Sequence, residues 1–308
     1  MSEEKKDLYY VIGDPVEHSL SPIMQNAAFN KLGINAHYEQ YLVKPGELEK
    51  FLLKDVFEKG VSGFNITIPH KVKAREILER VFPLNNNSSL QLDASFYVKL
   101  TEAVNTVKRE REQLLYWNTD ATGFLRVLNE KLNFIEKNNI SALLFGCGGA
   151  ARSIIAALGW KNSAVKKIYV YEEIAETVKN ASDFFFSKSI HAKTLNEKLK
   201  FIAKNEIESI IKECALLINA TPVGMKDAND SIVDRELLPK TGLSVFDIVY
   251  NKNQETRLVR DAKSIGLPVA DGLDMLLYQG ADAFELWTGE KAPIEVMRNA
   301  LIEGAKRI

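Results

Sequence analysis

Residues 146–151, with the sequence GCGGAA, have the residue types and spacing of a phosphate-binding turn. They follow the apolar run 142–145 and precede a helix-like stretch, which is the context that the pattern Gly-x-Gly-x-x-Ala needs. The first glycine allows a tight turn, the second lets the backbone approach a pyrophosphate, and the last small residue lets helix and strand pack closely. The helix N-terminus offers N–H groups and a positive dipole to the phosphates. An ordinary tight turn is the alternative interpretation. The residues that we predict to bind a dinucleotide here are Gly146, Gly148, Gly149 and Ala150.

A lysine and an aspartate could carry a proton. Lys71 closes the segment 63–71, which runs from a strand into a proline-marked turn, and Asp120 closes the polar run 118–120. Because α/β sheets place their sites at the carboxyl ends of strands, both side chains are expected at such an edge. Hydride transfer to a carbonyl requires a proton carrier, which this pair could supply. The structural alternatives are an exposed lysine at a helix start and an aspartate that serves as a helix N-cap.

Two series of alternating strands and helices must position these residues. In the first series, Ser21 followed by Pro22 predicts a helix with Ser21 as its N-cap. The βαβαβ order of this series predicts a mostly parallel sheet with helices on both faces. The expected elements of the first series are strands at 8–12, 38–43 and 64–68, an amphipathic helix at 47–58, and a hairpin of 103–107 with 114–117. The expected strands of the second series are 142–145, 168–171, 216–218, 244–248 and a strand at Val269, followed by helices at 271–289 and 293–308.

Composition narrows the class of protein. A chain of 308 residues predicts two domains, and 40 Lys and Arg against 41 Asp and Glu give a net charge of −1, so we expect neither nucleic acid nor a membrane surface as partner. No apolar stretch long enough to span a bilayer is present, and the charged N-terminal residues are unlike a signal peptide. Two cysteines suit a reducing compartment, and the four histidines show no metal-binding spacing. We therefore predict a cytoplasmic protein without a metal site.

Several blocks of sequence together resemble the shikimate dehydrogenase family, including its quinate/shikimate branch. They occur in the family's order over nearly the whole chain, so the resemblance is specific. The blocks are HSLSP at 18–22, NITIPHK at 65–71, AVNT at 103–106, NTD at 118–120, the glycine turn at 146, NATPVGM at 219–225, DIVYN at 247–251, DG at 271–272 and the segment 279–289.

The resemblance implies an α/β fold of two domains. These are a substrate-binding catalytic domain of residues 1–120, completed by the C-terminal helices 272–308, and a Rossmann-type, doubly wound dinucleotide-binding domain of residues 121–271. It implies Lys71 and Asp120 as the catalytic pair. The implied substrate ligands are Ser19, Ser21 and Tyr250 for the carboxylate, and Thr67, Asn105 and Gln279 for the ring hydroxyls. The further residues implied to bind the cofactor are Glu172, Thr221, Met225, Gly272 and Met275.

The implied activity is the reversible, NAD(P)H-dependent reduction of 3-dehydroshikimate to shikimate, a step toward chorismate and the aromatic amino acids. The alternatives are a catabolic quinate/shikimate dehydrogenase and a catalytically silent homologue that binds the same ligands. A small-molecule substrate is the expected partner, and the chain is expected to be a monomer or a homodimer. Glu172 and Glu173 stand where NADP-using relatives carry Asn-Arg, so we predict NAD as the preferred cofactor over NADP. The chain also departs from the family at Asp274, where many relatives have glycine, and in the segment 85–101.

Overall fold

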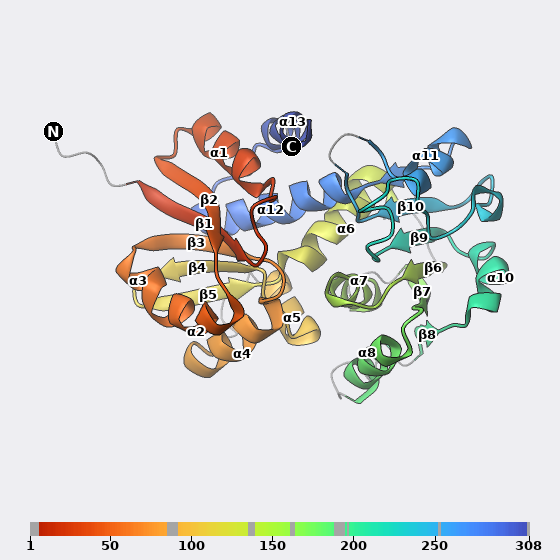
Figure 1. Ribbon diagram of the computed structural model, residues 1–308, viewed down its shortest axis with the longest axis horizontal. Helices are drawn as coiled ribbons and strands as arrows, with labels where there is room; N and C mark the ends of the chain where they lie inside the picture. The colour runs from red at the N-terminus through yellow and green to blue at the C-terminus, as the bar shows by residue number, and fades with distance from the viewer. Residues whose placement is uncertain are drawn as a thin grey trace. The chain divides into compact units, whose positions relative to one another are not determined.

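The computed structural model describes residues 6–84, 92–134, 139–160, 164–187, 195, 197–251 and 254–306. The chain divides into two compact units, one made of residues 1–123 and 276–308 and the other of residues 124–275 (Figure 1). Both boundaries fall within helices, namely α6 (Thr119–Leu132) and α12 (Gly272–Thr288). Of the segment 85–101, which departs from the family, residues 85–91 lie outside the described residues and the rest forms α5 (Leu92–Thr101).

The first unit is built on a five-stranded sheet of order β2-β1-β3-β4-β5. The first three strands in this order pair in parallel, as the βαβαβ pattern predicts, and β3-β4 and β4-β5 pair antiparallel. The hairpin expected from the sequence is therefore confirmed. The strands are β1 (Asp7–Gly13), β2 (Ala36–Leu42), β3 (Val61–Ile66), β4 (Thr106–Glu110) and β5 (Gln113–Trp117). Three further helices of this unit are α1 (Ser21–Leu32), α4 (Lys71–Val81) and α13 (Ile294–Ala305).

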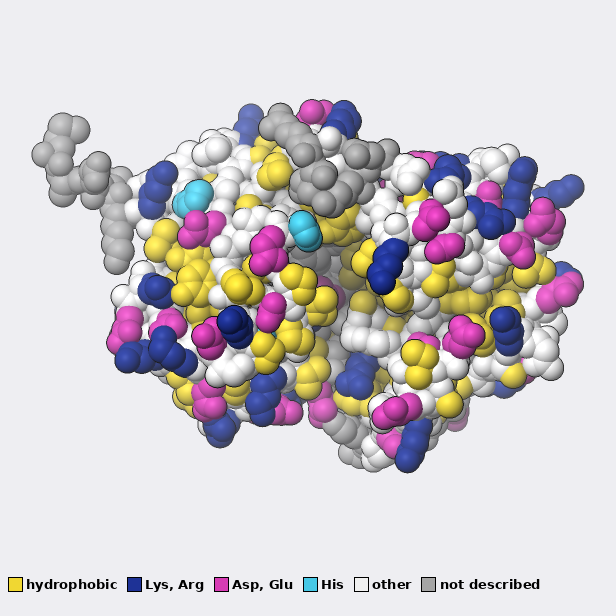
Figure 2. Space-filling model, viewed as in Figure 1, with side chains coloured by type: hydrophobic (Ala, Val, Ile, Leu, Met, Phe, Trp, Pro, Cys, Tyr) yellow, Lys and Arg dark blue, Asp and Glu magenta, His cyan; other side chains and the backbone are white. Residues whose placement is uncertain are grey.

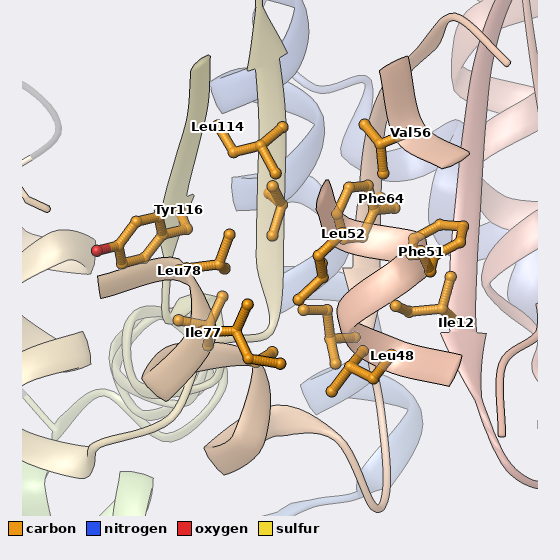
Figure 3. Close-up of a cluster of buried hydrophobic side chains, with 14 of the residues drawn as sticks. Ile12, Leu48, Phe51, Leu52, Val56, Phe64, Ile77, Leu78, Leu114 and Tyr116 are labelled. Carbon is orange, nitrogen blue, oxygen red and sulfur yellow. The ribbon is translucent and has the colours of Figure 1, made fainter. Parts of the chain in front are cut away.

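Alternate residues of β1 enter two different cores, because successive side chains of a strand point to opposite faces. Tyr10 and Ile12 belong to the cluster shown in Figure 3, in which the segment after β2 and helix α4 cover one face of the sheet. Tyr9 points to the other face, where its ring lies 5.0 Å from that of Phe29 and 5.1 Å from that of Trp287. On this side α1 packs against α13 (Figure 1). Both faces are thus covered, as predicted.

The segment predicted as one amphipathic helix at 47–58 is helical but irregular. A 3₁₀ turn (Pro45–Glu47), α2 (Leu48–Lys50), a π turn (Phe51–Asp55) and α3 (Val56–Glu58) follow one another. In a regular α-helix every fourth side chain is rotated a little further around the helix axis, because one turn has 3.6 residues. The π turn has more residues per turn and rotates the following side chains back. Leu48, Leu52 and Val56 consequently all stay buried in the same core.

The prediction that Ser21 caps α1 is wrong. Ser21 is the first helical residue, its N-cap is Leu20, and that cap makes no side-chain hydrogen bond to the helix. Ser21 is instead buried, and its backbone N–H donates to Ser19 Oγ at 3.3 Å. Because Ser21 already lies within the helix, its hydroxyl does not occupy the position from which an N-cap side chain accepts the free N–H groups of the first turn.

The second unit is built on a six-stranded parallel sheet of order β11-β10-β9-β6-β7-β8. Read from the other edge, this is the 3-2-1-4-5-6 order of the doubly wound dinucleotide-binding fold, so the predicted fold class is confirmed. The order reverses between β6 and β9, and open α/β sheets bind ligands at the carboxyl ends of strands at such a point. The strands are β6 (Ile140–Phe145), β7 (Val165–Tyr171), β8 (Leu199–Phe201), β9 (Leu216–Asn219), β10 (Ser244–Asp247) and β11 (Val269–Ala270). The helices used below are α7 (Gly149–Trp160), α8 (Ala175–Ser187) and α11 (Arg257–Ser264).

A buried carboxylate ties the ends of β9 and β10 to α11. Asp247 is fully buried and accepts hydrogen bonds from Asn219 Nδ2 at 2.9 Å, Val249 N at 3.0 Å and Thr256 Oγ1 at 2.6 Å. Thr256 is also the N-cap of α11. Burial raises the pKa of Asp247 from 3.8 to about 6, although the three hydrogen bonds oppose this shift.

The raised pKa of Asp247 predicts how folding stability depends on pH. Between pH 3.8 and about 6 the unfolded chain ionises this group while the folded chain does not, so stability falls as the pH rises through this window. The loss is about 3 kcal/mol at most. Asp247→Asn, whose amide oxygen keeps the Asn219 and Val249 bonds, should lose less stability across the window than the native chain. Urea unfolding of both proteins between pH 4 and 8 measures this, and parallel curves for the two proteins would contradict it.

Candidate active site

Lys71 and Asp120 form an ion pair in the first unit. Lys71 is the first residue of α4 and Asp120 the second residue of α6, and Lys71 Nζ lies 2.7 Å from Asp120 Oδ2. The lysine side chain is 28% exposed and the aspartate 13%, so both keep some contact with solvent. The structural interpretation of Asp120 as an N-cap is wrong: Asn118 Oδ1 accepts the bond from Ala121 N at 3.2 Å. Because Asn118 does this, the Asp120 carboxylate is available to the lysine.

Asn105 holds the other oxygen of the Asp120 carboxylate. Its Nδ2 donates to Asp120 Oδ1 at 2.8 Å and lies 3.4 Å from Gln279 Oε1 on α12. Its own oxygen accepts from the backbone N–H of Thr119 at 2.7 Å, and Asn105 is only 2% exposed. Four candidates from distant parts of the chain, Lys71, Asn105, Asp120 and Gln279, are thus brought together.

A buried polar chain that sequence reasoning missed continues behind Asn105. Thr106 Oγ1 lies 2.9 Å from Thr119 Oγ1 and accepts from Asn65 Nδ2 at 3.0 Å. The Tyr38 hydroxyl donates to Asn65 Oδ1 at 2.8 Å. Since buried polar groups cost free energy unless they are paired, such a network specifies one arrangement of side chains. The only signal in the sequence was that all of these are polar or aromatic side chains on predicted strands or their ends.

Three further substrate candidates are Ser19 in the loop between β1 and α1, Ser21 at the start of α1, and Thr67 directly after β3. Ser19 and Ser21 are neighbours, and Ser19 Oγ accepts from Ser21 N at 3.3 Å. Thr67 follows β3, and its backbone N–H donates to the Ile12 carbonyl at 2.9 Å. A Cβ on Gly13 would lie 2.4 Å from the Thr67 methyl group, so only glycine at this position lets the two strand ends approach this closely. The remaining candidate, Tyr250, follows β10 and therefore belongs to the second unit.

The glycine-rich turn of the second unit connects β6 to α7. Gly146 has φ of +92°, and a Cβ there would lie 2.9 Å from the Ala220 carbonyl oxygen, so this position requires glycine. Gly148 and Gly149 are exposed, and a Cβ on either would meet no atom within 4 Å. Open space in front of the N-terminus of a 12-residue helix fits a pyrophosphate group. The turn therefore has the shape that the dinucleotide prediction requires.

Glu172 lies against this turn. It follows β7 directly, and its Oε2 accepts from Cys147 N at 3.2 Å while its Oε1 accepts from Ile174 N at 3.1 Å. Burial, and the charge of Glu172, raise the pKa of the Cys147 thiol to about 11, which disfavours its thiolate form. Glu173 is exposed.

The other cofactor candidates follow β9 and β11. Thr221 donates to Asn219 Oδ1 at 2.6 Å and accepts from Val223 N at 3.1 Å, which shapes the turn beside Gly146. Met225 is 57% exposed. Gly272 starts α12, and a Cβ there would lie 2.3 Å from the Ile248 carbonyl oxygen. Met275, in the same first turn, is partly buried.

Asp274, one of the departures from the family, has a cation as its partner. Its Oδ1 lies 3.2 Å from Lys131 Nζ on α6, and both residues belong to the second unit. Burial of Asp271 raises its pKa, and the negative charge of Asp274 adds to this shift. Asp271 in turn accepts from the N–H groups of Leu273 and Asp274, so it caps α12.

The described residues contain no group of three or more His, Cys, Asp or Glu side chains that could hold a metal ion. None of the described helices is long and apolar enough to cross a membrane. On the face shown in Figure 2, Lys and Arg side chains are interspersed with Asp and Glu, and the described residues form no continuous patch of one sign.

Comparison with known proteins identifies the family. Residues 11–88 match the model of the shikimate dehydrogenase substrate binding domain, and residues 272–302 match that of the shikimate 5'-dehydrogenase C-terminal domain. A protein of Methanopyrus kandleri named shikimate dehydrogenase (NADP(+)) is 38% identical over 95% of this chain and 94% of its own length.

Two solved structures have the same fold. The shikimate 5-dehydrogenase of Thermus thermophilus in complex with NADP(H) and shikimate has a TM-score of 0.77 and 31% identity, over 97% of this chain and 99% of that one. The shikimate 5-dehydrogenase of Listeria monocytogenes in complex with shikimate and NAD has a TM-score of 0.79 and 29% identity, over 96% of both chains. On this similarity along its whole length, the chain belongs to the shikimate dehydrogenase family.

Proposed function

We propose that the protein is a shikimate dehydrogenase, which reversibly reduces 3-dehydroshikimate to shikimate with a nicotinamide dinucleotide as the redox partner. The observation that carries this proposal is the 2.7 Å ion pair of Lys71 and Asp120, held in place by Asn105. This activity places the protein in the synthesis of chorismate and the aromatic amino acids. The first unit is the substrate-binding domain and the second the dinucleotide-binding domain.

The proton step is assigned to the ion pair. The dinucleotide, when bound, supplies the hydride for reduction and accepts it in the reverse direction. Lys71 Nζ donates a proton to the oxygen of the reacting carbonyl and takes it back from the hydroxyl in the reverse direction. Asp120 Oδ2 fixes the direction of the ammonium, and Asn105 fixes Asp120. Lys71 and Asp120 are thus the catalytic residues of this proposal.

Substrate binding is assigned to the polar side chains around the pair. Ser19 and Ser21 bind the carboxylate as neutral donors, and Thr67, Asn105 and Gln279 bind the ring hydroxyls. That Tyr250 also binds the carboxylate stays a prediction from the family resemblance. Asn105 already lies within 3.4 Å of Gln279, which supports a shared set of hydroxyl ligands.

The two alternative functions, a catabolic quinate/shikimate dehydrogenase and a catalytically silent homologue, are less well supported. The curated relatives are named for shikimate rather than quinate, and a silent homologue would have no need of the ion pair.

The dinucleotide is assigned to the turn at Gly146, Gly148, Gly149 and Ala150, with Glu172 at the adenine ribose. Thr221, Met225, Gly272 and Met275 complete this site in the second unit. The close approaches at Gly146 and Gly272 and the open space before Gly148 and Gly149 support this assignment.

NAD is the preferred cofactor in this proposal, although the curated relatives are named as NADP enzymes. An acidic residue at the end of the second strand of this fold binds the ribose hydroxyls of NAD, whereas an arginine accepts the 2′-phosphate of NADP. The Glu172 carboxylate lies against the glycine-rich turn, and Glu173 adds a second negative charge. The family also includes an enzyme solved with NAD.

Location in the cytoplasm and a monomeric or dimeric state stay predictions.

Lys71→Ala should lower kcat for shikimate oxidation by roughly 10²- to 10⁴-fold, with a modest change in substrate binding, because the proton carrier is lost. Asp120→Asn should cause a similar loss. Lys73→Ala is the matched control, since Lys73 lies on the same helix but is exposed and pairs with Glu76. Steady-state kinetics on the three variants measure this, and near-native turnover by Lys71→Ala would refute the assignment.

Ser19→Ala and Ser21→Ala should each raise KM for shikimate on the order of tenfold, because a hydrogen bond to a charged group is worth roughly 1.5–3 kcal/mol. Their kcat should change less, since the carboxylate is remote from the reacting carbon. A serine whose removal leaves KM unchanged does not bind the carboxylate.

The native enzyme should show a higher kcat/KM with NAD than with NADP, by roughly ten- to a hundredfold. This factor corresponds to a repulsion of about 1–3 kcal/mol between the glutamates and a 2′-phosphate, after screening by solvent and salt. Glu173→Arg should shift the preference toward NADP. The test measures kcat/KM for both dinucleotides with both proteins, and an NADP preference of the native enzyme would show that another cation, such as Lys179, binds the phosphate.

A further inference from the structure

Helices α6 and α12 approach unusually closely within the first unit, and Gly123 is the point of contact. A Cβ placed on Gly123 would lie 2.6 Å from the backbone nitrogen of Gln279 and 2.7 Å from its Cα. Contacts below 3.0 Å are essentially never seen for real Cβ atoms, and here the opposing atoms are backbone, which cannot rotate away. Glycine is a poor helix former, so its presence inside α6 serves this contact rather than the helix.

A hydrogen bond holds the same two helices one turn further along α12. Thr122, the residue before Gly123, donates from Oγ1 to Asp282 Oδ2 at 2.5 Å. Gln279 and Asp282 are three residues apart and therefore on the same side of α12. The start of α6 is thus fitted to α12 by a steric contact and a polar one.

Helix α1 holds α12 at a neighbouring position. Gln25 is buried, and its Nε2 donates to the Gly280 carbonyl at 2.9 Å. A Cβ on Gly280 would lie 2.2 Å from the Met24 methyl group, so α1 also packs tightly here. Helix α12 is therefore positioned by α1 and by α6 together, so a change in its contact with α6 alters where its residues lie.

We infer that Gly123 is a positioning residue for substrate binding: its missing side chain sets the approach of α12 to α6 and so holds the Gln279 amide beside Asn105 and Asp120. The Gln279 Oε1 atom lies 3.4 Å from Asn105 Nδ2, and Asn105 bonds Asp120, so a displaced α12 would separate Gln279 from the remaining hydroxyl ligands. This inference rests on the proposed function, because it takes Gln279 to be a substrate ligand. If Gly123 served packing alone, its replacement would affect stability and leave substrate KM unchanged.

A double-mutant cycle tests the inference. Gly123→Ala is made in the native chain and in the Gln279→Ala variant. For each protein, kcat and the KM values for shikimate and for the dinucleotide are measured. In the native background KM for shikimate should rise about three- to tenfold, the effect of one lost hydrogen bond. KM for the dinucleotide should change less than about twofold, since the cofactor ligands on α12, Gly272 and Met275, lie one turn or more before Gln279 and belong to the second unit. In the Gln279→Ala background Gly123→Ala should raise KM for shikimate no further, because residues that act through one interaction are not additive.

Equal rises in both backgrounds, or an unchanged KM with a lower unfolding temperature, would overturn the inference. Gly46→Ala is the matched control in the same unit, because a Cβ there meets no atom within 4 Å, and its kinetics should match those of the native enzyme. If Gly123→Ala does not fold, Thr122→Val removes the bond to Asp282 without adding bulk, and the same cycle is run with it. A native enzyme that fails to oxidise shikimate would refute the proposed function itself, whereas additivity in an active enzyme refutes only the role of Gly123.

Discussion

The carboxylate of Asp120 is the point on which the candidate site depends, because each of its oxygens is bound by a different residue. Lys71 Nζ donates to one oxygen at 2.7 Å and Asn105 Nδ2 to the other at 2.8 Å. A lysine side chain has four rotatable bonds and is held poorly by packing alone, so its direction comes from the carboxylate. The carboxylate in turn is fixed by Asn105 and, behind it, by the buried chain of Thr106, Asn65 and Tyr38. The fold of the first unit serves this arrangement by bringing α4, β4 and α6 to one edge of the sheet.

In the second unit the constraint is the close approach of one backbone segment to another. At Gly146 and Gly272 a side chain would collide with the carbonyl oxygens of Ala220 and Ile248. A side chain on Gly148, by contrast, would meet no atom within 4 Å, so the space in front of this residue is open. Glu172 adds a carboxylate bonded to the turn itself, so the charge that we connect with NAD is part of the turn's own structure.

Sequence reasoning succeeded where structure is determined locally. The glycine-rich turn, the hairpin, and the parallel sheets follow from turn chemistry and from the alternation of strands and helices. It failed where a partner from a distant segment decides the outcome. Leu20 rather than Ser21 is the N-cap of α1, Asn118 rather than Asp120 caps α6, and the short strand β8 carries too few residues for a periodic signal.

The candidate site shows the same limit. The sequence alone singled out Lys71 and Asp120 as polar residues at strand ends, and the family resemblance paired them. Their 2.7 Å contact depends on how α4 and α6 are placed, which no local pattern specifies. The contact of Gly123 with Gln279 joins residues 156 positions apart, so the sequence could not predict it either.

The most direct test of the account is the rate at which the native enzyme reduces the dinucleotide when shikimate or quinate is the only other substrate. Nicotinamide absorbance follows this rate, with NAD and NADP each supplied in turn. The account predicts turnover with shikimate at a kcat/KM well above that with quinate, whichever dinucleotide is used. Preferential turnover of quinate would contradict the substrate assignment, and an absence of turnover with shikimate and either dinucleotide would contradict the central claim that Lys71 and Asp120 form a working catalytic pair.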